Sequence, residues 1–222
     1  MNKALRYASR INVVKTVWFN FRAFDFRTAI KVPVILGYGI KLKNIKKGGV
    51  KIKGKIHFGM VLLGLTGSED LRFFEQRKSY FEIKDNARVV FSENTRIGMH
   101  FSILCAGKLE FGKNFSSNNG CVFSCMNSIR FGEDVLLGGH ITVRDSEGHV
   151  ITVPDYNNAK SAEVVVGNHV WICNKADLLN GAKIADNTVI AYRSLCKKSY
   201  PPNVLIAGLP ARIVRKNITW KK

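Results

Sequence analysis

The sequence predicts an all-β solenoid, a three-sided prism built from short parallel strands. Two periods in the chain carry this prediction. The first is a hexad that opens on an apolar residue and has a small or apolar residue in fifth place, as in 137–142 and 166–171. The second is a spacing of twenty residues, which separates Phe91, Phe111 and Phe131. Three hexads plus two residues make one coil, a pattern that neither a helix nor simple strand alternation produces.

The hexad register assigns an opening residue to each short strand, and all of them except Ser117 are apolar or cysteine. They stand at positions 91, 97, 103, 111, 117, 123, 131, 137, 143, 166, 172, 178, 184, 190 and 196. Each is expected to point into a narrow shaft and to stack on its equivalent about 4.8 Å away along the axis. Small fifth residues and corner glycines would allow the tight bends. An antiparallel sandwich is the plain alternative, but a strict hexad disfavours it.

Length and composition fit one domain with small appendages. The chain has 222 residues, 46% of them hydrophobic, with 35 basic and 16 acidic residues and a net charge of +19. Such a chain can bury a core without disulfides or metal, and it is too apolar to be disordered. The excess positive charge suits phosphorylated small molecules, anionic membranes or nucleic acid, and it does not choose among them.

The regular pattern divides the chain into three parts. A basic, helix-compatible segment is expected over 1–48, the β-helix domain over 49–200 and a basic tail over 201–222. Val50, Ile56 and Leu62 are six residues apart and are the earliest candidates for the prism. Two insertions are expected within the domain. One is at about 64–80, where the sequence changes from Gly-rich to charged and aromatic, and the other is at about 144–163, where the hexads break.

The cysteines and the N-terminus bear on the compartment. The five cysteines form no Cys-x-x-Cys pair, so neither a zinc site nor a secreted disulfide framework is expected. Cys121 and Cys196 are expected in the core, and Cys105 and Cys125 one above the other as packing neighbours. Basic residues interrupt every early apolar run, and no apolar stretch reaches about 18 residues. We therefore expect a cytoplasmic protein.

Over roughly 83–215 the hexads resemble those of the left-handed parallel β-helix acyltransferases, most densely in 166–172 and 201–215. They are similar to the galactoside and maltose O-acetyltransferases and to the acetyltransferases of capsule and exopolysaccharide clusters. The resemblance implies a left-handed β-helix, a homotrimer, acetyl-CoA as donor and a sugar or polysaccharide precursor as acceptor. Cys173, Ala185 and Tyr192 replace the usual Gly, Gly and small residue, which is expected to narrow the donor channel.

The candidate catalytic base is His149. From Phe131 to Val166 the chain runs 35 residues where one coil needs about 20, so a loop must leave the prism after Val143. Its first residues, Arg-Asp-Ser-Glu-Gly-His at 144–149, resemble the catalytic loop of the polysaccharide acetyltransferases. A neutral imidazole can take the proton of an acceptor hydroxyl. Asp145, Glu147 or a backbone carbonyl could orient that ring. A solvated loop histidine is the alternative.

The donor and acceptor sites are inferred by the same resemblance. Trp171 is expected to point outward beside the groove that binds the pantetheine arm between adjacent prisms, or else to make a subunit contact. Asn174 and Tyr192 match groove-lining positions, and four cations match phosphate contacts, which fits the chemistry of Lys and Arg. The cations are Lys197, Lys198, Arg212 and Arg215. The acceptor candidates are Asn118 and His140, the latter near a corner where any polar surface residue would fit.

Other functions remain open from the sequence. His100 and His140 share a column, which raises a γ-class carbonic-anhydrase-like metalloenzyme, but that class needs two histidines five residues apart and none occur here. A non-catalytic basic solenoid, acting as a scaffold or on nucleic acid, lacks base-stacking aromatics on the prism. We therefore expect no metal and no nucleic acid. Residues 1–31 mix cations with large aromatics and either dock on the inner face of the membrane or pack against the prism base.

Overall fold

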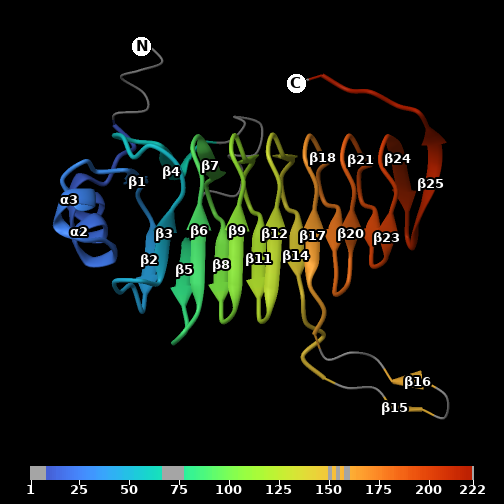
Figure 1. Cartoon of the computed structure of the whole chain (residues 1–222), viewed down its shortest axis with the longest axis horizontal. Coiled ribbons are helices and arrows are strands. Elements are labelled where there is room, and N and C mark those ends of the chain that lie inside the picture. The colour runs from blue at the N-terminus through green and yellow to red at the C-terminus, as the bar shows by residue number, and fades with distance from the viewer. Residues whose placement is uncertain (1–8, 67–77, 150–151, 154–155, 158–160, 222) are drawn as a thin grey trace.

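The computed structural model describes residues 9–66, 78–149, 152–153, 156–157 and 161–221. Three parallel sheets form the faces of a prism, and the chain visits them in turn, so that successive strands lie on successive faces (Figure 1). Among the described residues, two helices lie at one end of the prism, and a loop projects from a later coil. The predicted all-β solenoid is confirmed.

The strands of each sheet follow one another along the prism axis. The first sheet contains β1 (Val34–Leu36), β4 (Val61–Thr66), β7 (Thr95–Gly98), β10 (Ser116–Ser117), β13 (Leu136–Leu137), β18 (Trp171–Ile172), β21 (Val189–Ile190), β24 (Val204–Gly208) and β25 (Ala211–Lys216). The second contains β2 (Ile40–Lys43), β5 (Ser79–Ile83), β8 (Ser102–Cys105), β11 (Val122–Cys125), β14 (Thr142–Arg144), β19 (Asp177–Leu178) and β22 (Leu195–Cys196). The third contains β3 (Val50–Ile52), β6 (Arg88–Phe91), β9 (Lys108–Phe111), β12 (Ser128–Phe131), β17 (Val164–Val166), β20 (Lys183–Ile184) and β23 (Ser199–Tyr200). A separate antiparallel pair, β15 (Thr152–Val153) and β16 (Tyr156–Asn157), belongs to the projecting loop.

The shaft of the prism is filled by the opening residues of the hexads, all of which are buried. Their register follows the expected periods, and Phe91, Phe111 and Phe131 stack with ring centroids 5.4 and 5.5 Å apart and nearly parallel planes. Ser117, the polar exception, accepts a hydrogen bond from the Gly98 N–H through its hydroxyl at 3.4 Å. Stacked aromatic rings and continuous apolar burial stabilise each coil against its neighbours.

The corners differ from the expectation that glycine makes the bends. Fourth residues of the hexads adopt left-handed backbone conformations, and most are not glycine, for example His140 (φ 56°), Lys175 (φ 60°) and Asn187 (φ 55°). Asn, Asp and His tolerate this region better than other residues. Glycine is required instead at some second places, where neighbouring coils approach closely. A Cβ on Gly132 would lie 2.6 Å from the carbonyl carbon of Gly167.

The prism extends further toward both termini than 49–200. β1 and β2 lie within 1–48 because Val34 pairs with Val61 and Ile40 with Ser79. At the other end β24 pairs in parallel with β21, and β25 turns back antiparallel beside it. The insertion expected over 64–80 overlaps β4 and β5 at its two ends, and 67–77 lies outside the described residues.

The helices α2 (Val13–Ala23) and α3 (Phe26–Ala29) cover the start of the first sheet. The Asn12 side chain caps α2 by accepting from the Lys15 N–H. The buried Asn20 amide donates to the Val34 carbonyl at 2.7 Å and accepts from the Val34 N–H at 3.2 Å. Because these bonds satisfy the free edge of β1, the helix closes the prism as its cap. Neither described helix is long and apolar enough to cross a membrane.

Candidate functional site

The projecting loop occupies the interval that the hexad break predicted. Val143 in β14 lies beside Leu178 in β19 although 35 residues separate them, so the intervening chain must leave the prism and return. Its neck is closed by a bridge between Ser146 and Ser161 and by the hydrogen bond from the Ala162 N–H to the Asp145 carbonyl. A loop held at its base by backbone bonds places its first residues precisely enough for chemistry.

Asp145 anchors the loop to the coil before it. Its carboxylate is fully buried and accepts from the backbone N–H groups of Met126, Asn127 and Ser128 at 2.7, 2.8 and 2.6 Å. Three charge-assisted bonds to one turn make a strong clamp. The structure therefore gives Asp145 a structural task at the neck, where the sequence suggested that it orients His149.

Asp145→Ala is expected to lower the free energy of unfolding by about 2–4 kcal/mol, because bonds from a charged group to three N–H groups are lost. Urea denaturation measures the loss. Glu147→Ala, on the exposed part of the same loop, should change stability by less than about 0.5 kcal/mol. If Asp145→Ala kept full stability while the pH profile of turnover shifted, Asp145 would act on His149 instead.

His149 lies three residues beyond the neck, on an exposed turn. The Gly148 N–H donates to the Ser146 hydroxyl at 3.1 Å, and Gly148 has φ 78°, which favours glycine. The Arg144 Nε donates to the Ser146 carbonyl at 3.1 Å. Glu147 and His149 are both exposed. The turn thus presents the imidazole at the surface beside the anchored neck.

Two corners of the prism carry the candidate residues. We call the corner between the first and second sheets the histidine corner, since it carries His100 and His140, and the corner between the second and third sheets the loop corner, since the 145–163 loop leaves there. His149 belongs to the loop corner. The second sheet separates the two by a strand of about three residues, or roughly 10 Å.

The acceptor candidates lie on the histidine corner. Asn118 and His140 occupy adjacent coils there, and the His140 N–H donates to the Asn119 carbonyl at 2.9 Å. The His140 ring lies over Gly120, where an added Cβ would be 2.6 Å from its Nδ1. The neighbouring Asn119 is almost fully buried, and its side-chain oxygen accepts from the Met99 N–H at 3.0 Å. Because Gly120 has no side chain, the His140 imidazole can occupy this position.

The first sheet and the histidine corner also carry most donor-site candidates. Trp171 points outward with 38% of its surface exposed while Val170 is fully buried, as the hexad predicts. The Asn174 side-chain oxygen accepts from the Gly139 N–H at 2.9 Å and so ties two coils together. Tyr192 is exposed, and Lys175 Nζ lies 5.8 Å from its ring centroid.

The four candidate phosphate ligands are divided between two places. Arg215 lies in the row of the first sheet that leads through Leu205 and Val189 to Trp171, and Arg212 is on the same strand. Lys197 and Lys198 follow β22 at the loop corner, where Lys198 Nζ lies 5.6 Å from the Tyr200 ring centroid. One chain therefore has the arginines on the same sheet as Trp171 and the lysines at the same corner as the His149 loop.

A C-terminal contact beside Trp171 was missed by the sequence reasoning. Trp220 stacks on His169 with ring centroids 4.2 Å apart, and its Nε1 donates to the His169 carbonyl at 2.9 Å. Its ring centroid is 6.0 Å from that of Trp171. A large aromatic in a short basic tail was the only available signal. The chain end thus lies against the face that carries the donor-site candidates.

Two of the core cysteines, Cys121 and Cys196, are not activated thiols. Burial raises the pKa of Cys121 to about 11 and that of Cys196 to about 12, so both are protonated near neutral pH and are not nucleophiles. Cys105 and Cys125 lie side by side in register, as predicted, and are free thiols. Within the described ranges, no three His, Cys, Asp or Glu side chains gather as a metal site.

The chain is similar in sequence to known acetyltransferases. No protein-family model matches it. It is 27% identical over 146 residues to a lipopolysaccharide-biosynthesis O-acetyltransferase, WbbJ of Escherichia coli, covering 60% of this chain and 74% of the relative. It is 31% identical over 110 residues to the galactoside O-acetyltransferase of Escherichia coli, covering 49% of this chain and 54% of that one. The match thus spans only about half the length of the galactoside enzyme.

The solved structure of the polysialic-acid-specific acetyltransferase NeuO has the same fold. It superposes with a TM-score of 0.55 at 17% sequence identity, covering 86% of this chain and 89% of that chain. Together, the hexads, the parallel β-helix and the two sequence relatives make the chain similar to the hexapeptide-repeat acetyltransferases.

Proposed function

We propose that the protein transfers an acetyl group from acetyl-CoA to a hydroxyl of a sugar or polysaccharide precursor, with His149 as general base. The observation that carries the proposal is the anchored loop, which leaves the prism at its break and presents His149 three residues after its neck. The two relatives named above are a lipopolysaccharide O-acetyltransferase and a galactoside O-acetyltransferase, which supports the acceptor class.

The reaction needs little beyond positioning and one base. The His149 imidazole takes the proton of the acceptor hydroxyl as its oxygen attacks the thioester carbonyl. Backbone N–H groups near the carbonyl stabilise the oxyanion. The carbon–sulfur bond then breaks and releases the CoA thiolate. The protonated His149 returns its proton to that sulfur. Glu147, exposed on the same turn, is a candidate to orient the imidazole.

The donor fits the surface in chemical terms. Trp171 offers an exposed apolar face, while Arg212 and Arg215 on one strand offer guanidinium groups that suit phosphate oxygens. Tyr192 and Asn174 stand at the adjoining corner. Lys197 and Lys198 add two ammonium groups at the loop corner. Acetyl-CoA is a substrate in this scheme, and no metal is required.

We also propose that the site is completed between copies in a homotrimer. Within one chain, Asn118, His140 and Trp171 lie on the first sheet and histidine corner, whereas His149 lies on the loop corner. Prisms packed side by side around a threefold axis would bring the loop corner of one copy to the histidine corner of the next. Candidate base, acceptor residues and donor residues would then face a single groove.

The test is release of free thiol from acetyl-CoA in the presence of a panel of sugars and glycans. Acceptor-dependent thiol release that yields an O-acetylated product supports the proposal. The alternative functions are a basic non-catalytic scaffold and a γ-class carbonic-anhydrase-like metalloenzyme. Absence of release with every acceptor, together with bound metal in the purified protein, would contradict the proposal and favour the metalloenzyme. Absence of both would favour the scaffold.

A further inference from the structure

We propose that the outer face of the N-terminal helices is a docking surface for an anionic phospholipid bilayer. We call it the cap face and define it by Val14, Val17, Trp18 and Phe21 on α2, Phe26 on α3 and Ile30 at the C-terminal end of α3. The inference does not depend on the proposed reaction. It rests on the exposure of these side chains, on the charges around them and on a hollow beside them.

Helix α2 carries two stripes at helical spacing, and the more apolar one faces outward. The inward stripe, Thr16, Phe19, Asn20 and Ala23, is buried against the prism. The outward stripe, Val14, Val17, Trp18 and Phe21, is exposed by 81, 44, 50 and 44%. A helix that only caps a prism would carry polar residues on its outer side. The outward stripe therefore indicates a second surface that α2 covers.

The exposed stripe continues onto α3. The rings of Phe21 and Phe26 lie with centroids 6.0 Å apart, and Phe26 and Ile30 are exposed by 69 and 54%. Asp25, between the two helices, caps α3 by accepting from the Thr28 N–H. The result is one apolar surface across two elements, larger than the isolated exposed side chains that soluble proteins commonly tolerate.

The charge around the cap face favours an anionic partner. Residues 9–47 contain nine Lys or Arg and one acidic residue, Asp25. Lys43 and Lys46 pair with Glu82 and Asp85, but Arg22, Arg27 and Lys31 stand exposed on or beside the two helices. Apolar side chains surrounded by cations are the composition of helices that lie in the interface of anionic membranes.

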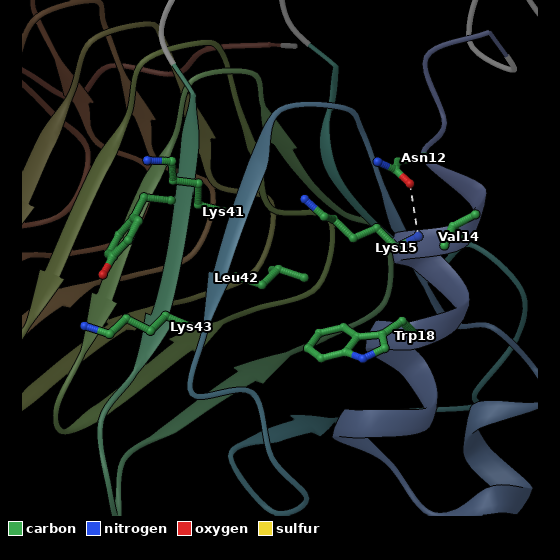
Figure 2. A pocket seen from close by; sticks show the side chains of 8 residues that line it. Asn12, Val14, Lys15, Trp18, Lys41, Leu42 and Lys43 are labelled. Atoms are coloured by element: carbon green, nitrogen blue, oxygen red, sulfur yellow. Dashed lines mark hydrogen bonds between the residues drawn. The ribbon is translucent and has the colours of Figure 1, made fainter.

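A hollow of about 750 Å³ opens between α2 and β2 next to this face (Figure 2). Val14 and Trp18 line it from the helix and Leu42 from the strand, while Lys41 and Lys43 lie along its strand side. Lys15 Nζ donates to the Ile40 carbonyl at 2.7 Å and crosses from helix to strand. Apolar walls with ammonium groups at their edge suit a phosphate headgroup above its acyl chains.

A second copy of this chain is the other possible occupant, and charge disfavours it. In a twofold contact the same patch faces itself, so the cations around one cap face would meet those of the other. Like charges brought together at an interface oppose association. A bilayer rich in anionic lipid offers acyl chains for the apolar stripe and negative headgroups for the cations around it. We therefore commit to the bilayer.

The experiment is flotation of the full chain with vesicles of phosphatidylglycerol and phosphatidylcholine, compared with phosphatidylcholine alone. Binding is expected only with the anionic vesicles and should weaken as salt rises. A chain of net charge +19 can bind any anionic surface. The position of the membrane-binding surface must therefore be tested with variants that have the same net charge. Val14→Asp and Leu209→Asp each add one carboxylate at a highly exposed position, the second at the far end of the prism.

Val14→Asp is expected to weaken binding to anionic vesicles by about tenfold or more, since it loses an apolar contact and repels the lipid. Leu209→Asp should change it by no more than about twofold. Thermal midpoints of both variants should match the parent. Equal effects of the two variants would overturn the proposal. So would a fall in particle mass for Val14→Asp without loss of vesicle binding, because the cap face would then be a contact between copies.

Discussion

Ile172→Asp is expected to destabilise the protein by several kcal/mol and to leave much of it unfolded, because an unpaired carboxylate would enter the apolar shaft. Ile172 is fully buried and lies in register between Leu137 and Ile190 on the coils to either side. A shortfall of this size is comparable to the whole stability of an ordinary domain. Thermal or urea denaturation followed by circular dichroism measures it.

Lys175→Asp is the matched control, since it places the same carboxylate in the same hexad but outside the shaft. Lys175 is exposed at the histidine corner with φ 60°, a conformation that aspartate tolerates, and it loses only a contact with the Tyr192 ring. The cost should stay within about 1 kcal/mol. If Ile172→Asp does not fold at all, Ile172→Ala should still show a loss of about 2–5 kcal/mol. Equal stability of the two aspartate variants would contradict the register.

The regular coils were predictable because the apolar residues of the sequence recur with the same period as the strands of the prism. Each of the three strands in a coil needs one residue that points into the shaft. The buried positions therefore follow the hexad from Phe91 to Cys196. The first coils were predicted only in part: Val50 was named as a candidate, but Val34, Ile40 and Val61 were not, and Ile56 and Leu62 are only partly buried. Val34, Ile40, Val50 and Val61 are buried and head their strands, but unequal corners separate them and hide the period. Pairing between parallel strands, which defines these coils, is non-local and leaves little local signal.

The candidate site was predictable only as far as local sequence extends. A break in the hexads located the loop, and the run 144–149 located His149 within it. Asp145 appeared to serve its neighbour four residues on, yet its oxygens are taken by N–H groups 17 to 19 residues earlier, on the adjacent coil. The clamp between Trp220 and His169 joins residues 51 positions apart. Neither partner could be inferred from spacing along the chain.

His149→Ala is expected to lower turnover by about two to four orders of magnitude, the usual effect of losing a general base. The side chain is exposed beyond the anchored neck, so the free energy of unfolding should change by less than about 0.5 kcal/mol. Acetyl-CoA binding should persist, since the proposed donor contacts are made by Trp171 and by Lys and Arg side chains and not by the His149 imidazole. Thiol release with a reactive acceptor, measured beside denaturation curves, separates lost chemistry from lost structure.

His140→Ala tells the base apart from a residue that merely lines the acceptor site. The His140 ring lies over Gly120 on the histidine corner of the prism. There it could contact an acceptor bound in the groove between two copies, but it is not part of the projecting loop. Its removal should raise KM more than it lowers kcat, because binding contacts act in ground and transition states alike. His149→Ala should instead lower kcat. If His140→Ala abolished turnover while His149→Ala kept it near normal, the base would be on the histidine corner, and the projecting loop would serve only to bind or enclose the acceptor.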